Sequence, residues 1–444
     1  MPGNAGGAKG RGYLVTFARS TILLGWEEPV NTTKPFVISK QAVWQAYRKV
    51  RSNAGAAGVD SQSLEEFDRD RDDNLYKLWN RMASGSYFPP PVRRVEIPKA
   101  DGGVRRLGVP TVADRIAQTV AATVLETSVE PIFDEDSYGY RPGRNAHDAI
   151  GVCRQRCWRY PWAIDLDVQA FFDNVDHDLL LKAVAHHTDQ RWVLLYVKRW
   201  LAAPVAEADG ALHHPQRGTP HGSAISPVLA NLFLHYAFDV WVRREFPSVP
   251  FERYADDVIV HCSSREQAEA VLAAVTERLA ACGLAVHPDK TRVVYCKQDG
   301  RAGSYEHVSF DFLGYTFKPR QARDRRGRFF TAFLPAVSAA AAKRMRQHIR
   351  AWHLHRRTNQ SLRSLAAIVN PVVRGWIAYY GRFYRSALGA LVLRRINEYL
   401  IRWVMWKHKP MRGSWKKAAQ FLARVAQSDP SLFAHWQLAT IGAR

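Results

Sequence analysis

Three things are scarce in this sequence: long apolar runs, cysteines and, toward its end, acidic residues. No segment approaches the roughly 18–20 consecutive apolar residues that a transmembrane helix needs. The glycine-rich start, through Arg11, lacks the apolar stretch and cleavage site of a signal peptide. We therefore expect an intracellular protein with no membrane partner.

The five cysteines are an odd number spread along a long chain: Cys153, Cys157, Cys262, Cys282 and Cys296. They do not form the two Cys-x2-Cys pairs of a zinc module. We expect these cysteines to be reduced and mostly to pack in the core.

Acidic residues almost disappear after Phe317. Residues 318–444 carry 26 Lys and Arg against three acids, whereas residues 1–317 carry 37 against 38. A near-neutral body joined to a strongly basic end is typical of a polyanion-binding protein, because neutralised phosphates release their condensed counterions. A solvated basic face is the alternative. With 47% hydrophobic residues, the 444-residue chain can bury the cores of about two or three domains.

Local patterns divide the chain into three parts. Residues 39–51 and 64–82 have the periodicity of amphipathic helices, and short strand-like runs such as 92–98 then alternate with helical patterns. This middle part indicates α/β or α+β architecture. From about residue 335 apolar residues recur at helical spacing almost to the end, which predicts a basic helical bundle.

Two acidic sites stand beside predicted strands. Residues 251–261 suit a hairpin with Asp256 and Asp257 at its tight turn, although acids in turns are usually just solvated. In the strand 162–168, alternation places Asp165 and Asp167 together on one face. If strand and hairpin are neighbours, three carboxylates converge and need divalent cations to offset their repulsion. Two Mg²⁺ ions about 3.5–4 Å apart would suit in-line phosphoryl transfer.

Nine sequence blocks in a fixed order carry a family resemblance. They are Gly55–Asp60, Ile97–Pro110 with Asp114-Arg115, Tyr138–Arg144, Asp167–Asp173 with Asp176-His177, Gly218–Pro227, Tyr254–Asp257, Lys290-Thr291, Phe312–Tyr315 and Arg374–Trp376. In these blocks, and from about Lys34 onward, the chain resembles the bacterial group II intron-encoded reverse transcriptases, also called the maturase family.

The resemblance implies an α+β right-hand polymerase, with fingers and an antiparallel palm sheet. It divides the chain into a flexible N-terminal segment at 1–33, a helical extension at 34–85, fingers and palm at 86–320, an all-α basic thumb or maturase domain at 321–410 and a short basic DNA-binding tail at 411–444. The C-terminal endonuclease domain of many relatives is not expected, so the protein should not cut the second target strand itself.

The resemblance also selects among the acids. It assigns metal binding to Asp167, not Asp165, together with Asp256, a supporting Asp257 and the backbone carbonyl of Val168. The implied cofactor is a pair of Mg²⁺ ions, for which Mn²⁺ can substitute.

Nucleotide contacts follow from the same resemblance. Lys99 and Arg105 flank a turn signal, and with Arg93 they would belong to fingers that close over the triphosphate. Phe171 matches the aromatic residue under the incoming sugar, although core packing is its alternative and Phe172 competes for the role. His221 stands where the family usually has glutamine, which leaves fidelity and activity in question.

Three further cations are expected at the template and primer. Arg141 and Arg144 would hold the template backbone or the nucleotide pocket, and salt bridges to the local acids at 134–136 are the rival interpretation. Lys290 matches a lysine near the primer end.

The implied function is an RNA-directed DNA polymerase that also binds its intron RNA for splicing and mobility. Its expected partners are structured intron RNA, an RNA template with DNA primer, target DNA and dNTPs, and a homodimer is possible. The expected location is the bacterial cytoplasm, associated with RNA or the nucleoid. The alternatives are a splicing chaperone with impaired polymerase, and a domesticated enzyme of repair or phage defence; a nuclease would leave the finger and thumb blocks unexplained.

Overall fold

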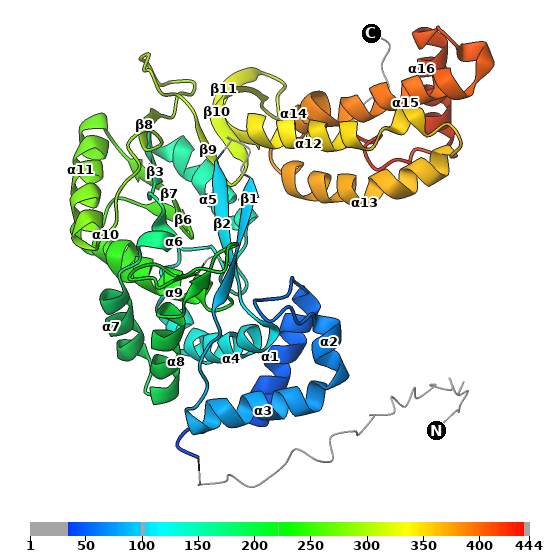
Figure 1. Ribbon diagram of the computed structural model, residues 1–444. Helices are drawn as coiled ribbons and strands as arrows, with labels where there is room; N and C mark the ends of the chain where they lie inside the picture. Colours follow the sequence, from blue (N-terminus) through cyan, green and yellow to red (C-terminus); the bar gives the residue numbers. More distant parts are fainter. Residues whose placement is uncertain (1–33, 99–102, 221, 439–444) are drawn as a thin grey trace, which may run out of the picture.

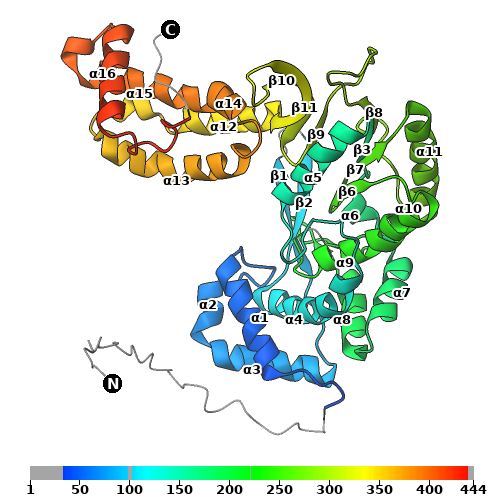
Figure 2. The ribbon, with the colours of Figure 1, turned by 180° about the vertical axis from the view of Figure 1, so that it is seen from behind.

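The computed structural model describes residues 34–98, 103–220 and 222–438. The predicted segment 1–33 and the candidate residues Lys99 and His221 lie outside these ranges. The molecule has the outline of a C (Figure 1). A central body of sheets and helices forms its back, the helices near the N-terminus form its lower arm, and the C-terminal helices form its upper arm. The view from behind shows the same arrangement (Figure 2).

The N-terminal extension consists of α1 (Lys40–Asn53), α2 (Leu64–Arg69) and α3 (Arg71–Ser84). Ser39 caps α1, and Ser63 with Glu66 forms a capping box at the start of α2, so two of the predicted helix starts are defined by local hydrogen bonds. The single helix predicted over 64–82 is divided at Asp70 into α2 and α3, because the backbone of Asp70 leaves the helical conformation. The apolar faces pack against α4 (Val112–Val129) and join the largest core. The extension is therefore part of the central body.

The palm sheet has the order β6 (Phe251–Tyr254), β7 (Asp257–Cys262), β3 (Trp162–Asp167) and β8 (Arg292–Tyr295), and every pair in it is antiparallel. Alternate residues face opposite sides: Ile164 and Val260 enter the largest core, whereas Ala163 and Ile259 face a second core that includes α5 (Ala146–Arg159). An antiparallel palm sheet in an α+β fold was predicted, and the structure has it.

Helices of the palm surround this sheet. They are α6 (Phe171–Asn174), α7 (His177–His187), α8 (Arg191–Leu201), α9 (Ser226–Leu234), α10 (Val240–Glu245) and α11 (Arg265–Ala281), with a 3₁₀ turn at Glu130–Ile132 and a π-helical turn at His235–Asp239. The fingers form a second sheet in the order β2 (Val104–Val109), β1 (Val92–Pro98), β4 (Val205–Ala206) and β5 (Leu212–His213). The β1–β2 hairpin stands over the palm (Figure 1).

A third sheet links the palm to the thumb: β9 (Phe310–Phe312), β10 (Tyr315–Arg323) and β11 (Phe329–Val337). The predicted boundary at residue 320 falls inside β10. The helices that follow are α12 (Ala339–Ala351), α13 (Leu362–Tyr380), α14 (Arg385–Leu388), α15 (Arg394–Lys407) and α16 (Trp415–Ser428), with short turns at Leu354–Arg356, Gly389–Leu393 and Lys409–Met411.

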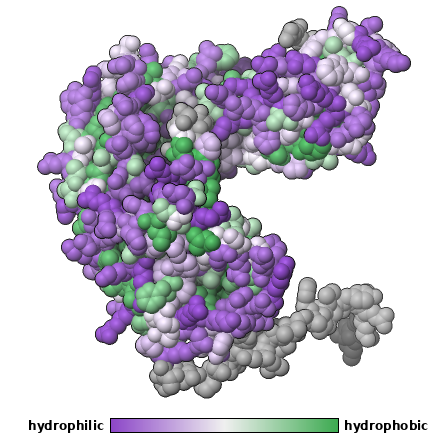
Figure 3. Space-filling model, in the orientation of Figure 1, coloured by the Kyte–Doolittle hydropathy of each residue, from purple (hydrophilic) through white to green (hydrophobic). Residues whose placement is uncertain are grey.

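These helices share one apolar core, separate from the two cores of the palm. Leu422 of α16 and Phe433 belong to that core, so the described part of the predicted tail, 411–438, packs with the thumb. The space-filling view shows hydrophilic residues over much of the thumb and a hollow between it and the lower arm (Figure 3). Among the described residues, no helix combines the length and apolarity that membrane crossing requires.

Candidate active site

The two predicted acidic sites meet at one end of the palm sheet. In the β3–β7 register Asp167 lies opposite Asp257, and Asp257 lies opposite Tyr254 across the β6–β7 hairpin. The turn between these strands is Ala255-Asp256, with Ala255 in the left-handed region at φ 58°. The hairpin tip therefore carries two acids directly beside the end of the central strand.

A cavity of about 910 Å³ opens above these acids. Asp167, Val168, Asp256 and Asp257 all line it, as does Arg106 from the fingers. Asp165 does not line the cavity, although it lies on the same face of β3. The structure thus distinguishes the two acids that strand alternation left equivalent.

Mutual repulsion shapes the charge of this site. Asp257 reaches solvent in the cavity, yet surrounding protein partly desolvates it, and this, with the nearby Asp256 and Asp167, raises the pKa of Asp257 to about 7. Lys290 opposes that shift, and its Nζ lies 3.3 Å from Oδ2 of Asp167. Burial, followed by Asp257 and Asp311, raises the pKa of Asp165 to about 7 as well. A cation at the acids would relieve this repulsion.

A buried arginine supports the hairpin tip. Arg253 is completely buried and binds the carboxylate of Asp239 with two hydrogen bonds of 2.7 and 2.6 Å. It also donates to Oδ1 of Asn231 at 2.9 Å and to the carbonyl of Ala255 at 3.1 Å. Arg253 therefore ties the turn that carries Asp256 to the helices beneath it.

The block that starts at Tyr138 packs against this same turn. Asn231 donates to the carbonyl of Gly139 at 2.7 Å, and the amide of Tyr138 donates to the carbonyl of Arg253 at 2.8 Å. A Cβ on Gly139 would lie 2.4 Å from the amide nitrogen of Ala255. Only glycine permits this close backbone approach.

These supporting residues were missed by sequence reasoning. Arg253 adjoins the Tyr-x-Asp-Asp string, but its partners Asp239 and Asn231 lie 14 and 22 residues away. Thr291 was quoted in a block without a role; its hydroxyl accepts a hydrogen bond from the amide of Asp167 at 3.2 Å.

The fingers residues are only partly brought to the cavity. Arg93 donates two hydrogen bonds, of 3.2 and 2.6 Å, to the carbonyl of Ala57 in the extension and does not line the cavity. Arg105 lies in β2, beside the described cavity residues Val104 and Arg106, and its side chain is outside the described parts of the chain, as are Lys99 and His221. Ser223 and Ala224 both donate hydrogen bonds to the side-chain oxygen of Gln118.

Both candidate aromatic residues border the cavity from α6. Phe171 is 1% exposed and Phe172 is 9% exposed, and their rings meet edge to face with centroids 5.2 Å apart. Phe171 also packs near Phe233. Phe171 therefore has the core packing that was its alternative interpretation, in addition to a place at the cavity wall.

Arg141 and Arg144 differ in their surroundings. The guanidinium of Arg141 is buried, pairs with Glu130 at 2.8 Å and donates to the carbonyls of Asp134 and Ser137. These contacts favour the salt-bridge interpretation over a template contact, with Glu130 as the acidic partner in place of the expected acids at 134–136. Arg144 donates to the carbonyl of Glu135 at 2.8 Å, lies over the Tyr138 ring and retains some exposure.

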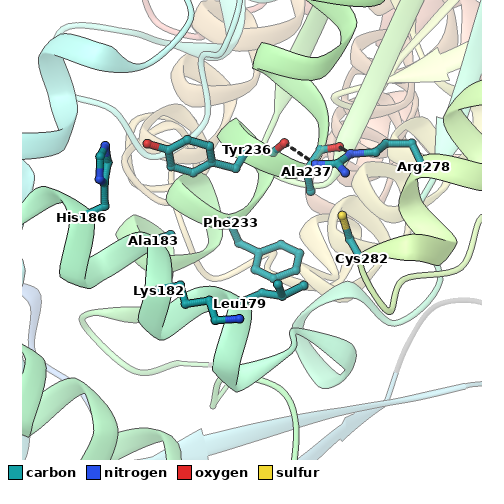
Figure 4. Close-up of a pocket in the computed structure, with 9 residues that line it drawn as sticks. All are labelled: Leu179, Lys182, Ala183, His186, Phe233, Tyr236, Ala237, Arg278 and Cys282. Atoms are coloured by element: carbon teal, nitrogen blue, oxygen red, sulfur yellow. Dashed lines mark hydrogen bonds between the residues drawn. The ribbon is translucent and has the colours of Figure 1, made fainter.

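Other cavities are not lined by these acids. One of about 510 Å³ is bordered by Arg94, Arg106 and Arg217 and shares Arg106 and Phe172 with the first cavity. Another, of about 420 Å³, is mostly apolar, with Phe233 on its floor and Arg278 at its edge, where it donates to the carbonyls of Tyr236 and Ala237 (Figure 4). Neither cavity contains the paired carboxylates of the palm.

A palm sheet with acids at a hairpin tip, a fingers hairpin above it and a helical thumb defines a right-hand polymerase fold. Residues 97–317 match the family model described as reverse transcriptase (RNA-dependent DNA polymerase). Residues 342–421 match the model described as the maturase-specific domain of group II introns. Protein YkfC of Escherichia coli strain K12 is 30% identical over 321 residues, which cover 63% of this chain and 81% of YkfC. The chain therefore belongs to the reverse transcriptase and maturase family of group II introns.

Two other relatives match this chain over only a small part of their own length. Group II intron-encoded protein LtrA of Lactococcus lactis subsp. cremoris is 30% identical over 203 residues, 45% of this chain and 33% of LtrA. An uncharacterized 91 kDa protein in the cob intron of Schizosaccharomyces pombe is 33% identical over 208 residues, 46% of this chain and 25% of that protein. The match thus spans a third or less of these two relatives. Telomerase from Candida albicans, solved with a telomeric RNA fragment, aligns with 84% of this chain and 68% of its own at a TM-score of 0.44 and 12% identity.

Polymerases of this family generally use divalent metal ions, and the residues at the cavity suit them. Carboxylate and carbonyl oxygens are the ligands that hard divalent cations prefer. Three carboxylates line one wall, and burial together with the charges of Asp256 and Asp167 raises the pKa of Asp257. The donor set therefore fits a divalent cation.

Proposed function

We propose that this protein is an RNA-directed DNA polymerase that uses two Mg²⁺ ions, for which Mn²⁺ can substitute. The observation that carries the proposal is the convergence of Asp167, Asp256 and Asp257 on one cavity between palm and fingers. When bound, two such ions would stabilise the attacking and leaving oxygens of nucleotidyl transfer.

The proposed roles follow the positions of the side chains. Asp167 and Asp256, with the carbonyl of Val168, would hold the metal ions, and Asp257 would support them. Lys290, exposed and 3.3 Å from Asp167, would contact the primer end. Phe171, at the cavity wall, would limit the space beside the nucleotide sugar.

The fingers would supply cations to the triphosphate. Lys99 and Arg105 retain this role from the resemblance, and His221 would meet the nascent base pair. Arg106 is a further candidate because its side chain lines the cavity from β2. Arg93, bound to Ala57, would act by fixing the base of the fingers hairpin. Arg144 remains a template candidate because part of its side chain is exposed.

We further propose that the thumb binds structured intron RNA and thereby promotes splicing and, with target DNA, mobility. The match of residues 342–421 to the maturase-specific domain and the excess of cations after residue 317 support this part. Basic helices contact phosphates without reading sequence.

The decisive experiment is dNTP incorporation on a primed RNA template with Mg²⁺. Asp256→Asn and Asp167→Asn should each reduce incorporation by about a thousandfold or more, because each removes a metal ligand. The matched control is Asp165→Asn, two residues away on the same strand face but outside the cavity, which should remain active. A wild-type protein that binds structured RNA without extending a primer would instead favour a splicing-only maturase.

A further inference from the structure

A second cluster of potential metal ligands lies beneath the palm sheet, on the face that α5 covers. Cys153 and Cys157 come from α5, Glu252 from β6, His261 from β7, and Cys296 directly follows β8. All five are fully buried, at 0% exposure. This cluster plays no part in the chemistry proposed above.

The positions of these residues along their helix and strands place their side chains on facing surfaces. Cys153 and Cys157 are four residues apart, so they lie on one face of α5. On β7, Asp257 and His261 share a face and are roughly 13 Å apart at about 3.3 Å per residue. Since α5 contacts both β6 and β7, its cysteines meet the sheet away from the candidate acids.

Three of the five donor groups lie close enough for one ion, and the other two cysteines adjoin them. Ligand atoms of Cys153, Glu252 and His261 all lie within 4.8 Å of one another. The Cys157 thiol interacts with those of Cys153 and Cys296 and with the imidazole of His261. The five side chains therefore form one contiguous group.

The histidine has the orientation of a metal ligand. Its Nε2 lies 2.7 Å from the Glu252 carboxylate, whereas its Nδ1 is buried and makes no hydrogen bond of regular geometry, although the imidazole interacts with the Cys157 thiol. In metal sites the ligating histidine typically donates its other ring N–H to a carboxylate, which matches the His261–Glu252 pair.

We propose that Cys153, Cys157, Cys296 and His261 bind a thiophilic divalent cation of the zinc type, with Glu252 orienting the histidine. Three thiolates and one imidazole are an established closed set for structural zinc. The ion would join α5, the end of β8 and β7, which is the strand that also carries Asp257. Its role is to stabilise the palm.

Two arginines offset the negative charge of such a site. Arg156 donates to Glu252 at 2.6 Å. Arg301 donates to the carbonyls of Cys157 and Cys296 at 2.9 and 2.6 Å, so its positive charge lies beside two of the ligands. These guanidinium groups therefore offset the negative charge that three buried thiolates would bring to the site.

The test begins with the metal content of the full chain, purified without chelators from zinc-supplemented culture. Elemental analysis should find about one zinc per chain in wild type. Cys157→Ser and Cys296→Ser should each lose most of it. Cys262→Ser is the matched control, since Cys262 is a buried cysteine next to His261 on the opposite face of β7, and it should retain zinc. Asp256→Asn should also retain it, which separates this site from the polymerase acids.

A second measurement needs no variant and so does not depend on a variant's folding. Wild type refolded with Co²⁺ should show thiolate-to-cobalt charge-transfer absorption in the near ultraviolet. Absence of zinc from wild type together with absence of these bands would overturn the proposal and leave the cysteines as packing residues. Zinc that persists in both Cys157→Ser and Cys296→Ser would overturn the ligand assignment.

Discussion

Arginines in the palm and arginines in the thumb are held in opposite ways. In the palm, Arg253 is fully buried against Asp239, and Arg243 pairs with Asp134 and Asp136 at 2.8 and 2.6 Å. In the described thumb, residues 339–438, Arg395 pairs with Glu398 at 2.7 Å. Within these described residues, the other lysines and arginines form no salt bridge with a carboxylate.

The cause of this difference is the distribution of acids. With three acids against 26 Lys and Arg after residue 317, this end of the chain cannot neutralise its cations internally, so most of them remain available for phosphate contacts. In the palm, acids and arginines are balanced, and their pairs fix the hairpin that presents Asp256. The same residue type is therefore structural in one region and available to ligands in the other.

Arg253→Met should produce the largest effect on stability. It leaves Asp239 buried without its partner, and breaking such a pair costs about 3–5 kcal/mol. We expect the free energy of unfolding in urea to fall by that amount. Arg374→Met, an exposed arginine on α13, is the thumb counterpart and should change it by less than about 0.5 kcal/mol. An equal loss of unfolding free energy in the two variants would contradict the view that arginines are structural in the palm and not in the thumb.

His435 gives the thumb an internal sensitivity to pH. Burial lowers the pKa of His435 to about 3, and its Nε2 lies 2.8 Å from Oδ1 of Asn397. Because the unfolded state takes up a proton near pH 6.5 and the folded state does not, this contribution is complete above pH 6.5 and is lost as pH falls below it.

Between pH 7 and pH 5 the loss from His435 should reach about 2 kcal/mol. Urea unfolding of wild type and His435→Phe at both pH values isolates it, since other titrating groups affect the two proteins alike. A wild type no more sensitive to pH than the variant would show that His435 becomes protonated within the fold.

Arg374→Met should weaken binding to a primed RNA template modestly, by several-fold, or about 1 kcal/mol. If Arg374 contacts one phosphate, the slope of log affinity against log salt should decrease by about 1. Arg395→Met is the matched control, because its guanidinium already pairs with Glu398. An unchanged salt slope in Arg374→Met would place the binding face elsewhere on the thumb.

Much of the fold was predictable because its signals are local. Alternation in residues 162–168 and the paired acids between two strand-like runs predicted strand β3 and the β6–β7 hairpin, and the structure contains both. The helix starts at Ser39 and Ser63 were likewise local, since the caps lie within a few residues of the amides they bind. The roles of the site residues remain predictions for the experiments above.

The long-range pairs were not predictable from spacing. Nothing within the Tyr138–Arg144 block indicates that Arg141 is buried against Glu130 while Arg144 remains partly exposed. The segment 411–444 was assigned as a short DNA-binding tail separate from the thumb domain, and its spacing does not indicate that Leu422 and Phe433 complete the thumb core. Burial depends on which surfaces meet in the folded chain, and those surfaces come from distant segments.

The sequence by itself determined the charge of each region and the face of each strand, because these follow from composition and from the two-residue period of a strand. Only the tertiary structure decided that Asp167 lines the cavity and Asp165 does not, since sheet register and the fingers set the cavity wall. Likewise, the cysteines show no local metal motif. They meet His261 only because α5 packs across the palm sheet, and such packing brings together residues more than a hundred positions apart.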